Sequence, residues 1–243
     1  MRWVILFLVA VLATTNCYAK NKHTKPQQKA TVQSWLVSNE DGSVVIGDNI
    51  NEQRSIASIT KLMTVMAVLD HGQDLKEKIG KFTREQLIQL AIIKSDNKAA
   101  ATLCNNIPGG RVECVRYMND KAKYLGMENT RFVEPTGLSP MNISTALDLI
   151  KMVQEASTYP EIIQGSNTAR YTFQQNKKWV SVNNTNPLVG KNFRIVVSKT
   201  GTTNAAGQCL VMMVDSDKGR RVLVLLGVKN RSRADVAKDL VTT

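Results

Sequence analysis

The sequence predicts an α+β three-layer sandwich: an antiparallel sheet of about five strands flanked by helices, with a helical subdomain in the middle of the chain. Two observations support this prediction. Segments with strand character lie near both ends of the 243 residues, and the long stretch between them has helical apolar spacing. If the strands near the two ends share one sheet, they must pair with each other, and helices then cover both faces.

The first 19 residues have the pattern of a secretory signal peptide. Met1-Arg2 provides a positive start, residues 3–13 are uniformly apolar, and small or polar residues lead to Ala19, where we expect cleavage. The apolar run is shorter than the roughly 20 residues of a membrane helix. We therefore expect a secreted, periplasmic or cell-wall-associated protein with no membrane span, in which a polar basic linker (20–30) precedes one folded domain (31–243).

The elements of that domain follow in order. Strands are predicted at 32–37 and 43–46, around a turn at Asn39-Glu40-Asp41-Gly42. Apolar periodicity predicts helices at 58–70, 83–93, 98–104, 112–125 and 144–156, the last with Ser144 as its N-cap. Strand character returns at 194–198, 208–214 and 221–228, and a short helix at 233–240 follows.

The charge balance favours an anionic polymer as partner. Lys and Arg number 32 against 20 Asp and Glu, which gives a net charge of +12. Only 5% of residues are aromatic and no zinc-knuckle spacing occurs, so nucleic acid is disfavoured. Three interpretations of the positive charge remain: binding to an anionic cell wall, binding to acidic lipid headgroups, or a basic surface that serves only solubility.

The histidines and cysteines exclude two large classes of hydrolase. His23, which lies in the basic linker, and His71 are the only histidines, and no cysteine pair has metal-ligand spacing. We therefore expect no metal and no cofactor, and a Ser-His-Asp triad lacks candidates. A hydrolase of this sequence needs a base other than histidine.

Three cysteines remain after residue 19. Cys104 and Cys114 flank the helix break Pro108-Gly109-Gly110, which could form a hairpin and bring them within disulfide range. Export to an oxidising compartment permits the bond. The alternative is that both are small buried apolar residues, as we expect for Cys209 in its strand.

Three short motifs carry the chemistry: Ser58-Ile59-Thr60-Lys61, Ser95-Asp96-Asn97 and Lys199-Thr200-Gly201. The first is expected to open a helix, the second to lie between two helices, and the third to end a strand. Positions i and i+3 of a helix share a face, so Lys61 can lie beside the Ser58 hydroxyl. The start of a helix also favours negative charge developing near the Ser58 N–H.

Lys61 can act as a base only if it is neutral, whereas a free lysine has a pKa of about 10.4. Burial lowers the pKa of a lysine, and a second cation lowers it further. Lys199 is the candidate second cation. Taken alone, Ser58 would be an ordinary helix cap and Lys61 a solvated surface lysine; the three motifs together favour the catalytic reading.

In this order the motifs are a signature of penicillin-binding proteins and class A β-lactamases. The sequence resembles the D-alanyl-D-alanine carboxypeptidases and endopeptidases, the low-molecular-mass penicillin-binding proteins or serine DD-peptidases. Further similar stretches cover nearly all of the chain after the linker: 56–64, 132–138 (FVEPTGL), 142–149, 184–186 and 199–212. The stretch 203–212 resembles the endopeptidase branch most.

This resemblance implies roles for the motif residues. Ser58 would attack a D-alanyl carbonyl and form an acyl-enzyme, with Lys61 as base and Ser95 relaying a proton to the leaving amine. The N–H groups of Ser58 and Thr202 would form the oxyanion hole. The substrate-binding residues would be Asn97, which holds the substrate's amide, and Lys199, Thr200, Gly201 and Thr202, around the carboxylate beside the scissile bond.

The implied substrates are peptidoglycan peptides ending in D-Ala-D-Ala or crosslinked through D-Ala to diaminopimelate, with β-lactams as covalent inhibitors. Two departures from the family bear on substrate preference: residues 62–94 form a shorter interval than expected, so a small hairpin near the cleft would be missing, and Thr202 replaces a bulkier residue. An endopeptidase acting on crosslinks is the first reading and a carboxypeptidase the alternative. A β-lactamase, with Glu134 activating water, and a non-catalytic wall-binding protein are the remaining rivals.

Overall fold

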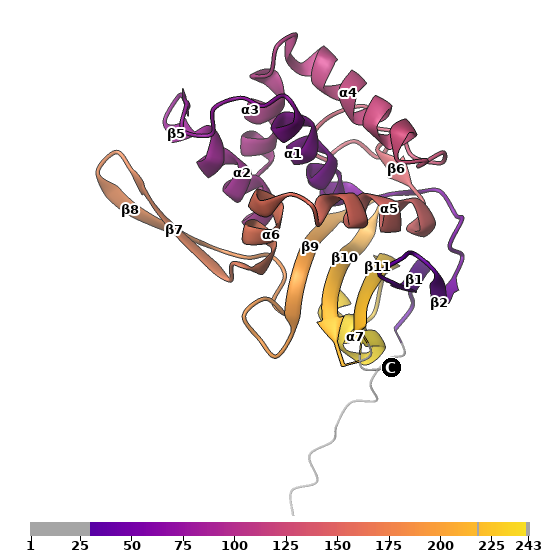
Figure 1. Ribbon diagram of the computed structural model, residues 1–243. Helices are drawn as coiled ribbons and strands as arrows, with labels where there is room; N and C mark the ends of the chain where they lie inside the picture. The colour runs from indigo at the N-terminus through magenta and orange to yellow at the C-terminus, as the bar shows by residue number, and fades with distance from the viewer. Residues whose placement is uncertain (1–29, 218, 242–243) are drawn as a thin grey trace, which may run out of the picture.

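In the computed structural model, which describes residues 30–217 and 219–241, five antiparallel strands form the central sheet (Figure 1). The strand order is β2-β1-β11-β10-β9. The bounds are β1 Ser34–Asn39, β2 Val44–Asp48, β9 Arg194–Thr203, β10 Gly207–Ser216 and β11 Gly219–Val228. The early strand β1 pairs with the late strand β11, with Trp35 opposite Leu225, which confirms the predicted pairing.

Helices cover both faces of the sheet, so the predicted α+β sandwich is confirmed. Along β11, Val222 and Val224 belong to the larger apolar cluster on one face, and Leu223 and Leu225 to the smaller one under α7. A strand buried on both faces reads as a continuous apolar run, as this one does. The helices are α1 Thr60–Asp70, α2 Arg84–Ile93, α3 Asn97–Asn105, α4 Gly110–Tyr124, α5 Ala146–Ala156, α6 Pro160–Asn167 and α7 Arg233–Val241.

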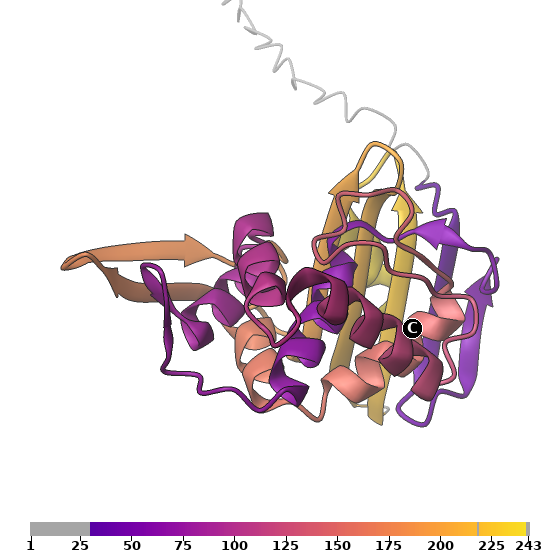
Figure 2. The ribbon, with the colours of Figure 1, turned by 90° about the horizontal axis from the view of Figure 1, so that it is seen from above.

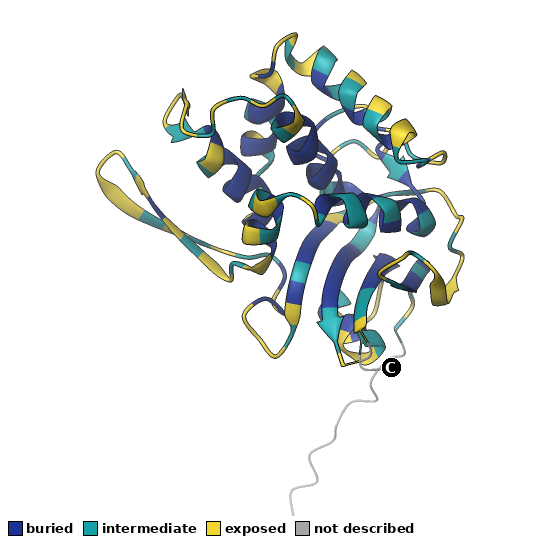
Figure 3. Cartoon of the chain, in the orientation of Figure 1, coloured by how far each residue is buried: buried dark blue, intermediate teal, exposed yellow. Residues whose placement is uncertain are grey.

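The larger cluster joins the sheet to the helical subdomain. α5 packs on β1, β10 and β11, and α6 packs on β9, whereas α1 contacts α3, α4 and α5. Figure 2 shows the helical region extending beyond the β9 edge of the sheet. α1 is buried along most of its length (Figure 3), and its first nine residues are all buried. This helix therefore carries Lys61 into the interior instead of presenting it at the surface.

Three of the predicted boundaries near the motifs and α5 were wrong. Ser58 does not open the long helix, because a 3₁₀ turn at Ala57–Ile59 precedes α1. The N-cap of α5 is Thr145, whose hydroxyl accepts from the Asp148 N–H at 3.1 Å, and Ser144 lies in the short strand β6. The strand before the third motif does not end there, since β9 runs on to Thr203.

Several short elements have no counterpart in the prediction. They are α6 and three two-stranded sheets: β3 Arg54–Ser55 with β6 Ile143–Ser144, β4 Lys78–Ile79 with β5 Phe82–Thr83, and β7 Arg170–Gln175 with β8 Lys178–Asn183. The β4–β5 hairpin lies between the first two motifs, so the expectation that the interval 62–94 lacks a small hairpin was wrong. The β7–β8 hairpin projects from the body beside it (Figures 1 and 2). Both hairpins lie near the second motif.

Cys104, in α3, and Cys114, in α4, are joined by a disulfide with a Cα–Cα distance of 5.5 Å. Cys209 is buried and free. Among the described residues, no helix combines the length and apolar character needed to cross a bilayer. The predicted signal peptide (1–19) and all but the last residue of the predicted linker (20–30) lie outside the described residues.

Candidate functional site

The candidate nucleophile lies on a tight turn with its candidate base one turn later. Ser58 is half-buried in the 3₁₀ turn, after Ala57, which has φ +48°. The Lys61 Nζ donates to the Ser58 Oγ at 2.7 Å and to the Thr136 carbonyl at 2.5 Å. The i, i+3 spacing thus brings the two side chains into hydrogen-bond contact.

Lys61 is 0% exposed, and its surroundings change its acidity. Burial lowers the pKa of Lys61 from 10.5 to about 8, while the negative charges of Glu134 and Asp96 raise it to a smaller extent. An ammonium loses hydration when buried, so the neutral amine is favoured. A substantial fraction of Lys61 is therefore neutral near pH 8, as a base requires.

The loop at 132–138 fixes the position of Lys61. The Glu134 carboxylate accepts hydrogen bonds from the Thr136 N–H (2.8 Å), the Thr136 hydroxyl (2.5 Å), the Gly137 N–H (2.6 Å) and Asn142 (3.0 Å). This orients the Thr136 carbonyl toward Lys61. A Cβ at Gly137, where φ is +82°, would lie 1.9 Å from the Ala57 carbonyl oxygen. Only glycine fits between the loop and the nucleophile's turn.

The third motif lies on β9, against the same turn. A Cβ at Gly201 would lie 2.9 Å from the Ser58 nitrogen, so the strand packs directly on the nucleophile's backbone. The Thr200 hydroxyl donates to the Thr185 hydroxyl at 2.6 Å, and the Thr185 N–H donates to the Ile93 carbonyl at 3.0 Å. Thr185 therefore ties β9 to the end of α2, just before the second motif.

Two cations adjoin this strand. Lys199 is 1% exposed, and its Nζ donates to the Thr200 carbonyl at 3.0 Å. Burial, followed by the charges of Lys61 and Arg233, lowers the pKa of Lys199 well below its ordinary value. The prediction that Lys199 lowers the pKa of Lys61 was therefore wrong: burial is the cause of the lowered pKa at Lys61, and it is the charge of Lys61 that lowers the pKa of Lys199.

Arg233, the first residue of α7, is the second cation. Its Nη1 donates to the Gly201 carbonyl at 2.6 Å and to the Thr202 hydroxyl at 2.7 Å. Burial lowers the pKa of Arg233 as well. Basic groups and hydrogen-bond donors are thus concentrated at β9: Lys199, the hydroxyls of Thr200 and Thr202, and Arg233, which reaches the strand from α7. This combination is suited to binding a carboxylate.

The second motif approaches from the turn between α2 and α3. Ser95 has φ +58°, Asp96 is the N-cap of α3, and Asn97 is the first residue of that helix. Within the described part of the chain, the side chains of Ser95 and Asn97 make no hydrogen bond, either to Ser58 or to Lys61. The Asp96 carboxylate is near enough to affect the pKa of Lys61.

Sequence reasoning missed some of these contributors. Glu134 and Thr136 belong to the FVEPTGL stretch, which contributed to the family resemblance but did not reveal that these residues position Lys61. Thr185 lies in the similar stretch 184–186, which likewise did not reveal its contact with Thr200. Nothing in the sequence indicated that Arg233 belongs to the site, because a single arginine at the start of a predicted helix is common. No group of acidic, histidine or cysteine residues in the described ranges could hold a metal ion.

Comparison with known proteins identifies relatives over most of the chain. Residues 20–79 and 73–230 match the model of the D-alanyl-D-alanine carboxypeptidase family, peptidase S11. A D-alanyl-D-alanine endopeptidase of Escherichia coli is 41% identical over 206 residues, which span 75% of this chain and 66% of that protein. A D-alanyl-D-alanine endopeptidase of Pseudomonas aeruginosa is 39% identical, with 82% of this chain and 72% of that protein covered. The cefotaxime-bound penicillin-binding protein D2 of Listeria monocytogenes has a similar structure, with a TM-score of 0.77, 25% identity and coverage of 86% and 95% of the two chains.

Proposed function

Because this chain belongs to the D-alanyl-D-alanine carboxypeptidase family of serine peptidases, we propose that it hydrolyses D-alanyl bonds in peptidoglycan peptides through an acyl-enzyme on Ser58. One observation carries the proposal. The buried Lys61 amine, with its pKa lowered to about 8, contacts the Ser58 hydroxyl at 2.7 Å. A nucleophile within hydrogen-bond reach of a base that is partly neutral at working pH is what acyl transfer requires.

In acylation, the Ser58 Oγ bonds to the D-alanyl carbonyl carbon as its proton passes to Lys61. The N–H groups of Ser58 and Thr202 stabilise the oxyanion. Ser95 relays the proton to the leaving nitrogen as the C–N bond breaks, which leaves an ester on Ser58. Water then attacks the ester, the D-alanyl carboxylate departs, and the Ser58 hydroxyl is restored.

Asn97 holds the amide of the peptide before the scissile bond. Lys199, Thr200 and Thr202 receive the carboxylate of the residue after it, and Gly201 lets the strand approach the nucleophile. We add Arg233 to this carboxylate pocket, because it already donates to Gly201 and Thr202. A bound carboxylate raises the pKa of a neighbouring amine, so substrate entry favours the charged form of Lys199.

Within this activity we favour cleavage of crosslinks. Two relatives, 41% and 39% identical, are named endopeptidases. In a crosslink from D-Ala to diaminopimelate, the leaving nitrogen sits on a D-centre that carries a carboxylate, so the same pocket accepts it. Cleavage of a crosslink additionally requires room for a second peptide. The small Thr202 side chain leaves space at this position and so supports crosslink cleavage. The alternative, a carboxypeptidase, needs only the same pocket.

The bonding of Glu134 argues against a β-lactamase. Both carboxylate oxygens already accept hydrogen bonds from the loop, so neither is free to activate a deacylating water. We further propose that residues 1–19 direct export and that the enzyme works outside the cytoplasm.

Covalent capture of penicillin tests the proposal. Mass spectrometry of purified protein with penicillin should show one adduct, on the peptide that contains Ser58, and none in Ser58→Ala. A non-catalytic wall-binding protein would not label covalently. An adduct retained in Ser58→Ala would remove Ser58 from its role.

Muropeptides test the preference. Crosslinked dimers and monomeric pentapeptides should be digested separately and the products resolved by chromatography. We expect the dimer to be converted to monomers. Release of D-alanine from the monomer with the dimer left whole would make the protein a carboxypeptidase.

A further inference from the structure

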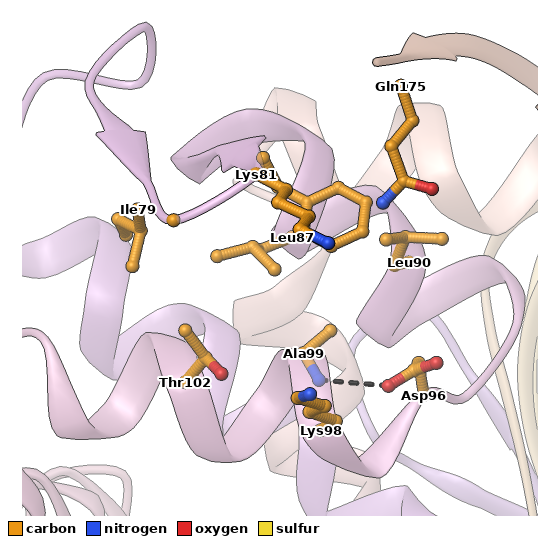
Figure 4. Close-up of a pocket in the computed structure, with 11 residues that line it drawn as sticks. Ile79, Lys81, Leu87, Leu90, Asp96, Lys98, Ala99, Thr102 and Gln175 are labelled. Carbon is orange, nitrogen blue, oxygen red and sulfur yellow. Dashed lines mark hydrogen bonds between the residues drawn. The ribbon is translucent and has the colours of Figure 1, made fainter. Parts of the chain in front are cut away.

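A pocket of about 600 Å³ lies beside the second motif, outside the residues assigned so far. Its walls come from the β4–β5 hairpin, from α2 and α3, and from Gln175 near the tip of the β7–β8 hairpin (Figure 4). Asp96, which stands between Ser95 and Asn97, also lines it. The pocket therefore continues from the turn that is proposed to hold the substrate's amide.

The pocket has an apolar floor and a cationic rim. Ile79, Leu87 and Leu90 form the floor with Phe82, whose ring lies 6.0 Å from that of Phe173 in β7. Lys81 and Lys98, both exposed, form the rim (Figure 4). In the described ranges neither lysine has an ion-pair partner. Both charges are thus available to a ligand.

The one acidic group in the lining is already engaged. The Asp96 carboxylate caps α3 by accepting from the Ala99 N–H at 2.9 Å, as Figure 4 shows, and lies 4.0 Å from the Lys94 amine. The pocket as a whole is therefore attractive to anions.

A second pocket, of about 400 Å³, lies on the same β4–β5 hairpin. It shares Gly80, Lys81 and Phe82 with the first pocket and adds Lys78 and Lys177. Lys78 and Lys177 are both exposed. Positive charge thus extends along both hairpins, away from the second motif.

We propose that the first pocket, with its rim of Lys81 and Lys98, binds the acidic stem of the wall peptide that precedes the D-alanyl bond. This inference rests on the proposed function. Because Asp96 lines the pocket and is the neighbour of Asn97 in the chain, a peptide whose amide is held by Asn97 can extend its preceding residues into this pocket. In a wall peptide, D-glutamate and diaminopimelate each carry a free carboxylate on a short aliphatic chain, against the single free amine of diaminopimelate. The net negative charge matches the lysine rim, and the aliphatic chains match the apolar floor. The pocket selects long anionic stems over short neutral ones.

Charge reversal tests this. In Lys81→Glu/Lys98→Glu, the concentration of N-acetyl-L-Ala-γ-D-Glu-diaminopimelate-D-Ala-D-Ala that halves the rate of fluorescent-penicillin labelling should rise about tenfold, from the loss and reversal of two exposed charge contacts. The concentration of diacetyl-L-Lys-D-Ala-D-Ala that has the same effect should not change, because its acetylated lysine offers the lysine rim no free carboxylate. The labelling rate without peptide should also be unchanged, because penicillin contacts only the site at Ser58.

The control Lys123→Glu/Lys229→Glu has the same net charge but alters exposed lysines outside both pockets. We expect it to match the parent with both peptides. The inference is overturned if Lys81→Glu/Lys98→Glu behaves like the parent, if both peptides weaken equally, or if the control weakens the long peptide as much. A parent protein that never labels with penicillin contradicts the proposed function instead.

Discussion

Lys61 makes the proposed reaction depend on pH. Only the neutral amine accepts the Ser58 proton, and its pKa is about 8. The rate of penicillin acylation should therefore rise roughly tenfold per unit as pH increases toward 8 and level off above it. Stopped-time labelling from pH 6 to 9.5 measures the profile. A flat profile below pH 8 would assign the proton transfer to another group.

Lys61→Arg is the matching variant. It keeps the positive charge but cannot lose a proton near neutral pH, so acylation should fall about 10²–10⁴-fold while the fold survives. Circular dichroism provides the check on folding. A labelling rate within a few-fold of the parent would place the base elsewhere.

Gly137 permits a further prediction. Its need for positive φ can be separated from its need for space by comparison with Gly72, which has positive φ but no close neighbour. Gly137→Ala would place a Cβ 1.9 Å from the Ala57 carbonyl oxygen, so the nucleophile's turn must shift and penicillin labelling should fall at least tenfold. Gly72 also has positive φ, +62°, but no atom lies within 4 Å of its hypothetical Cβ. Gly72→Ala should therefore cost only about 1 kcal/mol of stability and leave labelling intact. Equal labelling in the two variants would show that the close approach is unimportant.

For single residues, the sequence predicted the members of the candidate site that belong to short motifs. Ser58 and Lys61 are three positions apart, so helical geometry alone predicted their contact. The support for that contact comes from residues distant in the chain: the Thr136 carbonyl lies 75 positions from Lys61. Arg233 reaches Gly201 from 32 positions away. Contacts of this kind depend on the packing of whole elements, which no local spacing encodes.

Among the elements, α3 and α4 are linked by the disulfide between Cys104 and Cys114. Protein from which residues 1–19 have been removed should show one free thiol when denatured without reductant, Cys209, and three after reduction. Closing so short a loop stabilises by about 2–3 kcal/mol in the chain-entropy model. Cys104→Ala/Cys114→Ala should accordingly lower Tm by roughly 5–10 °C. Three free thiols without reductant would exclude the bond.

The length of an element decided whether the sequence predicted it. The helices α1, α2 and α5 are ten or eleven residues long and apolar enough for their spacing to be read. The strands β3 to β6 have two residues each, too few for any periodicity. The β7–β8 hairpin was missed for another reason. Most of its residues are polar, and Trp179 is 71% exposed, so its pattern resembles a loop.

For the whole molecule, the net charge of +12 predicts attachment to an anionic wall. Retention of purified protein on isolated wall sacculi should be strong at low salt and largely lost at about 1 M salt, where charges are screened within roughly 3 Å. Penicillin labelling, which depends on buried contacts, should change little over the same range. Sedimentation with sacculi measures retention. Attachment that is insensitive to salt would indicate a contact that is not electrostatic.

The strand order also affects when the chain can fold during its synthesis. β11 lies between β1 and β10, although it is the last strand along the chain. The ribosome must therefore release more than 220 residues before the sheet can close. Pairings between such distant segments form slowly. Under the proposed export, this delay would keep the growing chain unfolded while it passes through an export channel. Ser58 and Gly201 meet only once β9 has joined the sheet, so the proposed active site would assemble only after export.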